Sequence, residues 1–257
     1  MHAEGDGAPK QAYARLRKAI PKTWHPYLRA LRKRVLRENF VPDEPYCHVY
    51  AFTQASLPRQ RSIHEKTAAL VAEGIAGDFV ECGVLDGGTA ALMAYAIRAD
   101  DRRLHLFDAW QGLPQSTKED GEAALKWVGD VVGSPKRVVS VLRKVSARMD
   151  RVVFHKGWYD DTLPGSDTGP VAFLHIDCDF YDPTKLVLET FMPRMVPGGW
   201  VQIDDYLSFQ GCRLAVDEYL AKHPELTLTV DETPGGAIHM RIPASWSASG
   251  EGGRASA

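Results

Sequence analysis

The sequence lacks the features that define several large classes of protein. It has four cysteines in 257 residues, and none of them forms a Cys-x-x-Cys pair, so neither a zinc cluster nor a disulfide framework is predicted. No run of about 18 apolar residues occurs, and the N-terminus has no apolar signal-peptide core, which argues against a membrane-spanning or a secreted protein. We therefore expect reduced thiols and a cytoplasmic protein.

A large net charge of either sign is also absent, but the charge is unevenly distributed. The chain has 31 Lys and Arg against 33 Asp and Glu, a formal net charge of −2. Residues 1–40 hold ten basic and three acidic side chains, so this arm carries +7 and the remainder −9. A basic arm that docks on nucleic acid or an anionic membrane, in a protein that is not an enzyme, is one alternative. Apolar residues at helical spacing between 27 and 36 predict instead an ordinary amphipathic helix, and we expect neither nucleic acid nor a membrane as partner.

Short apolar runs alternate with helical segments from residue 78 onward. Strands are expected at 79–84, 103–107, 151–155, 171–176 and 199–203, followed by a hairpin of 226–230 and 237–242. Helices are expected at 59–73, 88–98, 119–132, 135–145, 183–195 and 209–222. This alternation predicts an α/β fold with a mostly parallel sheet that helices cover on both faces.

Two features after the first strands indicate a cofactor that carries a nucleoside. Gly83, Gly87 and Gly88 lead from the first strand into a helix, where glycines allow a ligand to approach the backbone and the helix start offers free N–H donors. The spacing is neither that of a dinucleotide fingerprint nor of a P-loop, and a plain tight turn is the alternative. Asp108 ends the second strand, where an acid commonly binds a ribose. These features suit S-adenosylmethionine and a nicotinamide equally, so an NAD-dependent oxidoreductase is an alternative.

Carboxylates follow the fourth and fifth strands. Asp177 and Asp179 come after the fourth strand, and Asp204 and Asp205 after the fifth. If these strands are neighbours, four like charges meet at one edge of the sheet and raise one another's pKa unless a cation compensates them. A hard divalent cation such as Mg²⁺ would relieve the repulsion. For Asp179 the alternative is that it caps the helix that follows.

The order of these motifs resembles the macrocin O-methyltransferase family, which includes the mycinamicin and novobiocin sugar O-methyltransferases. The resemblance covers residues 46–240. Its segments are ECGV…GG (81–88), D…GLP (108–114), GWY…TLP (157–164), DCDFY (177–181) and PGG…DDY…AVDE (197–218). It implies a class I methyltransferase (Rossmann-like) fold with a seven-stranded sheet, the last strand antiparallel. It also implies S-adenosylmethionine, Mg²⁺, and methyl transfer to a sugar hydroxyl of a glycosylated natural product or of a bacterial oligo- or polysaccharide such as a methylated mannoside.

The resemblance further implies roles for single residues. The cofactor would be bound by Glu81, Gly83, Val84, Gly87, Gly88, Thr89, Asp108, Ala109, Trp158, Thr53 and Tyr50, the last two from a segment that folds over it. Asp177, Asp204 and Asp205 would bind the metal, and Asp177 would also be the general base. His155, His175 and His239 are alternative bases.

The sequence departs from the family at two places. Leu85 and Asp86 stand where relatives often have an aromatic and a basic residue, and residues 1–40 have no counterpart that can be aligned. Residues 1–57 are therefore interpreted as a helical extension with the cofactor-covering segment, 58–244 as the methyltransferase domain, and 1–9 and 245–257 as disordered ends. The extension is expected to provide a homodimer contact. A catechol-type phenolic O-methyltransferase is a further alternative, although that group usually pairs its metal aspartate with Asp-Asn rather than Asp-Asp.

Overall fold

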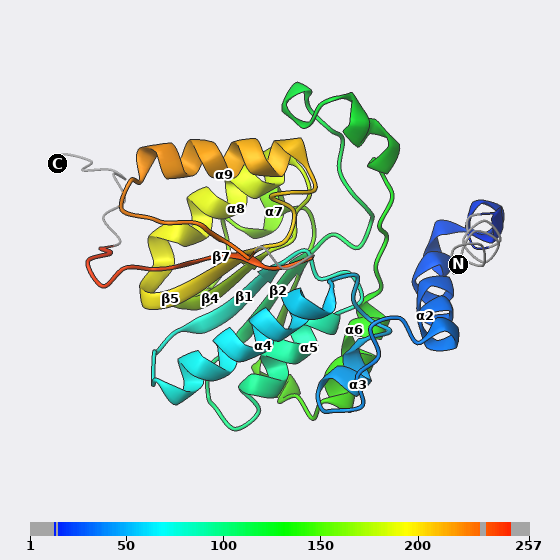
Figure 1. The fold of residues 1–257 in the computed structure, drawn as a ribbon, viewed down its shortest axis with the longest axis horizontal. Helices are drawn as coiled ribbons and strands as arrows, with labels where there is room; N and C mark the ends of the chain where they lie inside the picture. The colour runs from blue at the N-terminus through cyan, green and yellow to red at the C-terminus, as the bar shows by residue number, and fades with distance from the viewer. Residues whose placement is uncertain (1–12, 14, 232–234, 248–257) are drawn as a thin grey trace, which may run out of the picture.

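The computed structural model describes residue 13, residues 15–231 and residues 235–247. At its centre is a seven-stranded sheet of order β3-β2-β1-β4-β5-β7-β6 (Figure 1). Its strands are β1 (Asp78–Cys82), β2 (Leu104–Asp108), β3 (Val152–Lys156), β4 (Val171–Ile176), β5 (Met195–Ile203), β6 (Thr229–Val230) and β7 (Ile238–Arg241). Strands β1 to β5 are parallel to one another, and β7 runs antiparallel to β5 and β6. The predicted α/β fold, including the C-terminal hairpin, is confirmed.

Helices cover both faces of this sheet. The α-helices are α2 (His25–Leu36), α3 (Tyr46–Val49), α4 (Leu57–Ala72), α5 (Gly88–Ala96), α6 (Pro135–Lys144), α7 (Tyr159–Thr162), α8 (Tyr181–Phe191) and α9 (Gln210–Lys222). Short 3₁₀ turns are η1 (Lys22–Trp24), η2 (Lys118–Asp120), η3 (Glu122–Trp127), η4 (Met149–Arg151) and η5 (Met192–Arg194). Helices α4, α5 and α6 lie below the sheet in Figure 1, and α7, α8 and α9 lie above it. No helix in the described part of the chain is long and apolar enough to cross a membrane.

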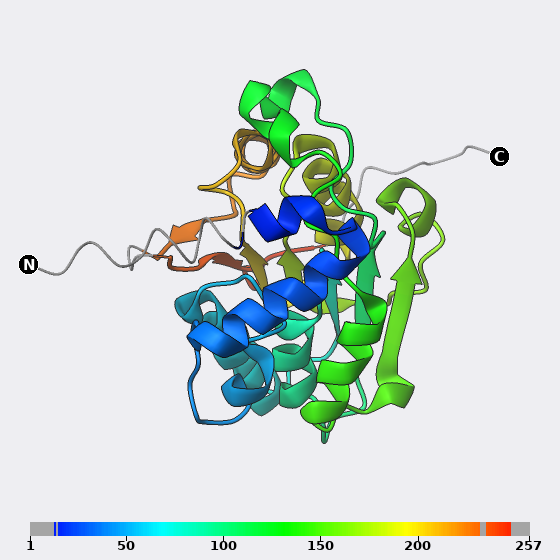
Figure 2. The same cartoon turned by 90° about the vertical axis from the view of Figure 1, so that its right-hand side faces the viewer.

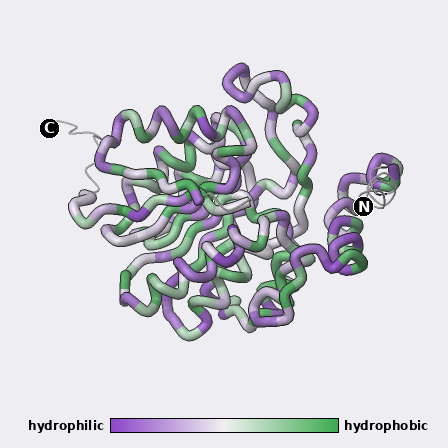
Figure 3. Tube along the Cα trace, viewed as in Figure 1, coloured by the Kyte–Doolittle hydropathy of each residue, from purple (hydrophilic) through white to green (hydrophobic). Residues whose placement is uncertain are grey.

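Alternation along the strands produces two apolar cores. Phe79 of β1 points into the core beneath α4, α5 and α6, whereas Val80 points into the core beneath α8 and α9. Burying one such side chain completely contributes roughly 1.5–3 kcal/mol. Many residues of the central strands are apolar (Figure 3), and the loops at the carboxyl ends of these strands are where open α/β sheets bind ligands.

The predicted helix at 119–132 is wrong. The structure has the two short turns η2 and η3, which project away from the sheet (Figure 1). Asp120 accepts hydrogen bonds from the Thr117 backbone at 2.8 Å and, through its other oxygen, from the Tyr181 backbone at 2.7 Å. Positive φ at Gly121 (71°) and Gly129 (67°) then turns the chain out of helical geometry. A long-range contact of one buried carboxylate thus decides a segment whose local sequence favours a helix.

The predicted basic helix exists as α2. It lies across the side of the molecule that faces the viewer in Figure 2. Its outer face is apolar as well as basic, because Trp24 just before it, Leu31 and Val35 are 64%, 58% and 71% exposed. The predictions of disorder for residues 1–9 and most of 245–257 fall outside the described residues.

Candidate active site

A cavity of about 720 Å³ opens at the carboxyl ends of the parallel strands. This is the position that open α/β sheets favour for ligands, because the strand order reverses between β1 and β4. Residues from β1, β2, β3, β4 and β5 or from the loops after them meet here. The predicted site residues that line the cavity are Gly83, Asp108, Ala109, Trp158, Asp177, Asp204 and Asp205.

The glycines of the turn after β1 are required by the chain itself. A Cβ atom on Gly83, whose φ is 95°, would overlap the carbonyl oxygen of Asp177. A Cβ atom on Gly88 would lie 2.6 Å from that of Thr53, and the Gly88 N–H donates to the Phe52 carbonyl at 3.0 Å. The segment around Thr53 therefore packs on the glycine turn, as expected, although neither Thr53 nor Gly88 lines the cavity.

Asp108 connects the ends of β1 and β2. One carboxylate oxygen accepts hydrogen bonds from the Val84 and Leu85 amides at 2.9 and 2.8 Å, and the other accepts from the Trp110 amide at 2.5 Å. Burial raises the pKa of Asp108, and these amide hydrogen bonds oppose the rise. The residue predicted to bind a ribose thus holds the glycine turn in shape, and one lone pair remains on its Oδ1 for a hydroxyl donor.

Several predicted residues lie behind the cavity wall rather than in it. Glu81 is fully buried and accepts a hydrogen bond from His175 Nδ1 at 2.9 Å. Tyr50 packs edge-on against Phe40, with the ring centroids 5.1 Å apart. Five further residues of this group do not line the cavity either: Val84 and Gly87 of the turn, Gly88 and Thr89 at the start of α5, and Thr53. Direct contact of these side chains with a ligand in the cavity is therefore not part of this geometry.

We use the name acidic rim for Asp177, Asp179, Asp204 and Asp205, which all line the cavity. Burial and the neighbouring carboxylates raise the pKa of Asp177 and Asp179 well above the ordinary value. Burial and the charge of Asp204 raise the pKa of Asp205 to about 6, although hydrogen bonds from the Asp177 carboxyl and the Asp179 amide, the latter at 3.0 Å, oppose the rise. Burial and mutual repulsion thus disfavour the charged forms of Asp177, Asp179 and Asp205.

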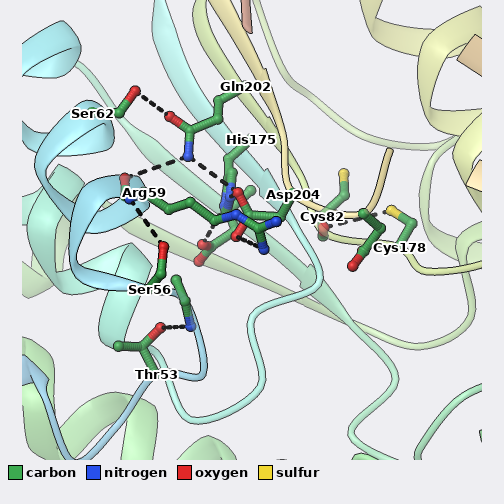
Figure 4. A network of polar contacts seen from close by, with 12 residues as sticks. Thr53, Ser56, Arg59, Ser62, Cys82, His175, Cys178, Gln202 and Asp204 are labelled. Atoms are coloured by element: carbon green, nitrogen blue, oxygen red, sulfur yellow. Dashed lines mark hydrogen bonds and ion pairs between the residues drawn. The ribbon is translucent and has the colours of Figure 1, made fainter. Parts of the chain in front are cut away.

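Asp204 differs from the rest of the acidic rim because the chain provides partners for it (Figure 4). His175 Nε2 lies 3.3 Å from one carboxylate oxygen, and Gln202 donates to that oxygen at 3.1 Å. Arg59 lies 3.8 Å from the other oxygen. Although burial raises the pKa of Asp204, the charges of His175 and Arg59 lower it below the ordinary value. Ser62 donates to Gln202 at 2.8 Å, so α4 buttresses this network.

The predicted metal triad is only partly assembled. Asp177 and Asp205 share a hydrogen bond, while Asp204 is directed to its own partners. Among the described residues, this triad is not one of the groups whose three ligand atoms all lie within 4.8 Å of one another. None of the three histidines considered as bases lines the cavity.

Sequence reasoning missed the contact between α2 and the glycine turn. Asp86, 1% exposed in its side chain, forms ion pairs with Arg29 of α2 at 2.8 Å and with Arg137 of α6 at 3.3 Å. Lys33 of α2 donates to the Thr53 carbonyl. The two departures from the family pattern therefore meet: the acid at position 86 is neutralised by a base from the N-terminal helix. An acid in the turn together with an arginine-rich helix was the available signal.

Relatives with assigned activities resemble most of the chain. Residues 21–237 match the macrocin-O-methyltransferase (TylF) family, so the match begins inside the segment that we could not align. An 8-demethyl-8-(2,3-dimethoxy-alpha-L-rhamnosyl)-tetracenomycin-C 4'-O-methyltransferase of Streptomyces olivaceus is 34% identical over 76% of this chain and 77% of its own length. The mycinamicin III 3''-O-methyltransferase of Micromonospora griseorubida is 34% identical over 67% of this chain and 72% of its own length.

Solved structures give the same result. The O-methyltransferase NovP superposes with a TM-score of 0.68 at 26% identity, over 87% of this chain and 100% of NovP. The calicheamicin methyltransferase CalS11 shares the fold, with a TM-score of 0.60 at 19% identity over 93% of this chain and 94% of that one. With the family match over residues 21–237, these relatives show that the chain belongs to the macrocin O-methyltransferase family.

Proposed function

We propose that the protein transfers a methyl group from S-adenosylmethionine to a sugar hydroxyl with the help of a divalent cation. The observation that carries this proposal is the meeting, in one cavity, of the glycine turn after β1, Asp108 at the end of β2 and the acidic rim. A nicotinamide reaction has no use for the acidic rim, and membership of a methyltransferase family sets that alternative aside.

The cavity fits S-adenosylmethionine in size and chemistry. A volume of about 720 Å³ lies within the usual range for sites that bind small molecules. Gly83 leaves backbone exposed where a side chain would block approach. Asp108, Ala109 and Trp158 line the cavity, and we propose that the first two bind the ribose and that the Trp158 ring contacts the adenine.

The acidic rim fits Mg²⁺. Its donors are carboxylate oxygens, the ligands that Mg²⁺ prefers, and a cation would offset the burial and mutual repulsion that raise the pKa of Asp177, Asp179 and Asp205. We propose Asp177, Asp204 and Asp205 as the metal ligands. Asp204 brings a carboxylate that His175 and Arg59 keep ionised.

The proposed mechanism assigns the proton transfer to the chain. When bound, S-adenosylmethionine supplies an electrophilic methyl group, and Mg²⁺ supplies a charge that lowers the pKa of a nearby hydroxyl. The Asp177 carboxylate, which lines the cavity and which a bound cation would keep ionised, takes the proton of the acceptor hydroxyl. Asp205 and the hydrogen-bonded backbone of Asp179 hold Asp177 in place. Positioning of acceptor and methyl donor supplies much of the remaining rate.

A sugar suits the mouth of the cavity. Trp127 and Phe209 line it, and flat apolar rings of this kind pack against the C–H faces of a sugar ring. The relatives' names describe methylation of rhamnosyl, novobiocin and mycinamicin compounds. We propose that the acceptor is a glycosylated natural product or a bacterial oligosaccharide.

A methyl-transfer assay with radiolabelled S-adenosylmethionine tests the proposal. Defined glycosides and oligosaccharides, including methylmannosides, are compared with catechol, in Mg²⁺ and in EDTA. Activity on a glycoside that EDTA abolishes supports the proposal. Activity on catechol alone, or on a glycoside at full rate in EDTA, would contradict it.

We further propose a cytoplasmic homodimer. The four cysteines are free thiols, as in a reducing compartment. The exposed apolar residues Trp24, Leu31 and Val35 on the outer side of α2 provide a surface for a second copy. Sedimentation of the wild type against Leu31→Glu tests the assembly, and an unchanged sedimentation coefficient in the variant would contradict it.

A further inference from the structure

A second cluster of ligand-type side chains lies away from the cavity. His105 of β2, His155 of β3 and Asp167 of the loop before β4 place their ligand atoms within 4.8 Å of one another. In the described part of the chain this is the one group of three that meets this criterion. None of its members lines the cavity. His105 stands near the amino end of its strand, whereas the cavity opens at the carboxyl ends.

The two histidines face each other at the spacing of two ligands on one ion. His105 Nδ1 and His155 Nε2 are 3.0 Å apart. The His155 ring stacks on Phe107, with centroids 4.0 Å apart, which fixes its orientation. Two nitrogen ligands at about 2.0–2.1 Å from a tetrahedral ion are separated by a little over 3 Å.

A neighbouring carboxylate orients His105. Asp78 Oδ2 lies 3.3 Å from His105 Nε2, and Asp78 Oδ1 accepts a hydrogen bond from the Arg103 amide at 2.8 Å. In the tautomer whose Nε2 donates to Asp78, Nδ1 keeps a lone pair, and Nδ1 is the nitrogen that faces His155. A carboxylate behind a ligating histidine is the usual outer contact of a zinc site.

The third member keeps the cluster accessible. The Asp167 side chain is 67% exposed and pairs through one oxygen with Arg103 at 3.1 Å, so an ion can reach the cluster from solvent. Two imidazoles and one carboxylate are a ligand set for zinc-like ions, and they leave a fourth position for water. Mg²⁺, which prefers oxygen ligands, belongs to the acidic rim instead.

We propose that His105, His155 and Asp167 form a site for a zinc-class transition-metal ion. The site connects β2, the edge strand β3 and the loop before β4. A bound ion would therefore hold β3, which has only β2 as a neighbour in the described sheet, in place. It is independent of methyl transfer, and its failure would leave the proposed function untouched.

A Co²⁺ titration tests the site, because four-coordinate Co²⁺ absorbs visible light. The untagged full-length chain is stripped with EDTA, dialysed and titrated in excess Mg²⁺, which occupies the acidic rim. We expect one equivalent to bind with a visible band, and Zn²⁺ to displace it. His155→Ala and Asp167→Asn should each weaken binding at least about tenfold. His223→Ala, which removes an exposed histidine paired with Glu225, should bind like the wild type.

Each other outcome overturns the proposal. Absence of a visible band at about 100 μM Co²⁺ would mean that the histidines form only a hydrogen-bonded chain with Asp78. Equal binding by the wild type and Asp167→Asn would place the ion elsewhere, and because Asp167 is exposed this variant leaves the core intact. Loss of binding in His223→Ala would place the ion at His223 and not at the proposed site.

Discussion

Asp86 in the glycine turn and Asp205 in the acidic rim are both buried carboxylates, and the chain treats them in opposite ways. Asp86 lies between Arg29 and Arg137, at 2.8 and 3.3 Å. Asp205 is almost as buried, but carboxylates are its nearest charged neighbours, and its pKa is raised to about 6. A buried acid with its own cations is complete and serves the fold. A buried acid without such partners needs a cation from outside the chain to balance its charge, and this need is the physical basis of a metal site.

The largest effect is expected from Asp177→Asn, which removes the proposed base. Methyl transfer should fall by about 10³-fold, within the range for loss of a general base, while S-adenosylhomocysteine binding stays within a few-fold of the wild type. Single-turnover rates and calorimetry measure the two quantities. Asp150→Asn, on the exposed turn η4, controls for lost charge. Wild-type turnover in Asp177→Asn would remove Asp177 from the mechanism.

Arg29→Ala should break the complete side of the comparison. It leaves Asp86 buried with Arg137 alone, and a cost of about 3 kcal/mol in the free energy of unfolding is expected, at the low end for broken buried pairs. Urea denaturation measures it, with Arg34→Ala on the same helix as the control. The double variant Arg29→Ala/Asp86→Asn should recover part of the loss. If Arg29→Ala and Arg34→Ala are equally stable, the pair has no structural role.

Mg²⁺ should stabilise the incomplete side. At about 100 times its dissociation constant, an ion that binds only the folded chain adds about 2.7 kcal/mol. Differential scanning calorimetry should show this as a higher melting temperature in the wild type and a smaller rise in Asp205→Asn. An equal rise in both proteins would place the ion away from the acidic rim.

Lys33 gives the smallest effect and a pH dependence. Burial lowers its pKa to about 8, so between about pH 8 and 10.5 the unfolded chain holds more protons than the folded one. Stability attributable to Lys33 therefore rises with pH, by roughly 1 kcal/mol between pH 7 and 9. The difference between the wild type and Lys33→Met, followed by urea denaturation at both pH values, should grow in favour of the wild type. A constant difference would show that Lys33 is not desolvated.

The sequence was sufficient to predict the features that depend on where the strands end. Asp177 and Asp205 could be brought together because neighbouring parallel strands end at the same edge of the sheet. It was insufficient where one long-range contact overrides a local pattern. The expected helix at 119–132 does not form, and Asp120 instead accepts a hydrogen bond from the amide of Tyr181, 61 residues away. Glu81 was placed in the pocket, but its partner His175 stands opposite it on β4, and that pairing depends on the strand order.

The contact of Gly83 with the Asp177 carbonyl has a consequence for redesign of the enzyme. Main chain touches main chain there, so the distance between the glycine turn and the backbone of Asp177, the proposed base, depends on no exchangeable side chain. Acceptor scope can therefore be altered at the mouth, at Trp127 or Phe209, without retuning the reacting groups. A side chain at position 83 would push the glycine turn and the Asp177 backbone apart. We therefore expect every substitution of Gly83 to impair cofactor binding and proton transfer together.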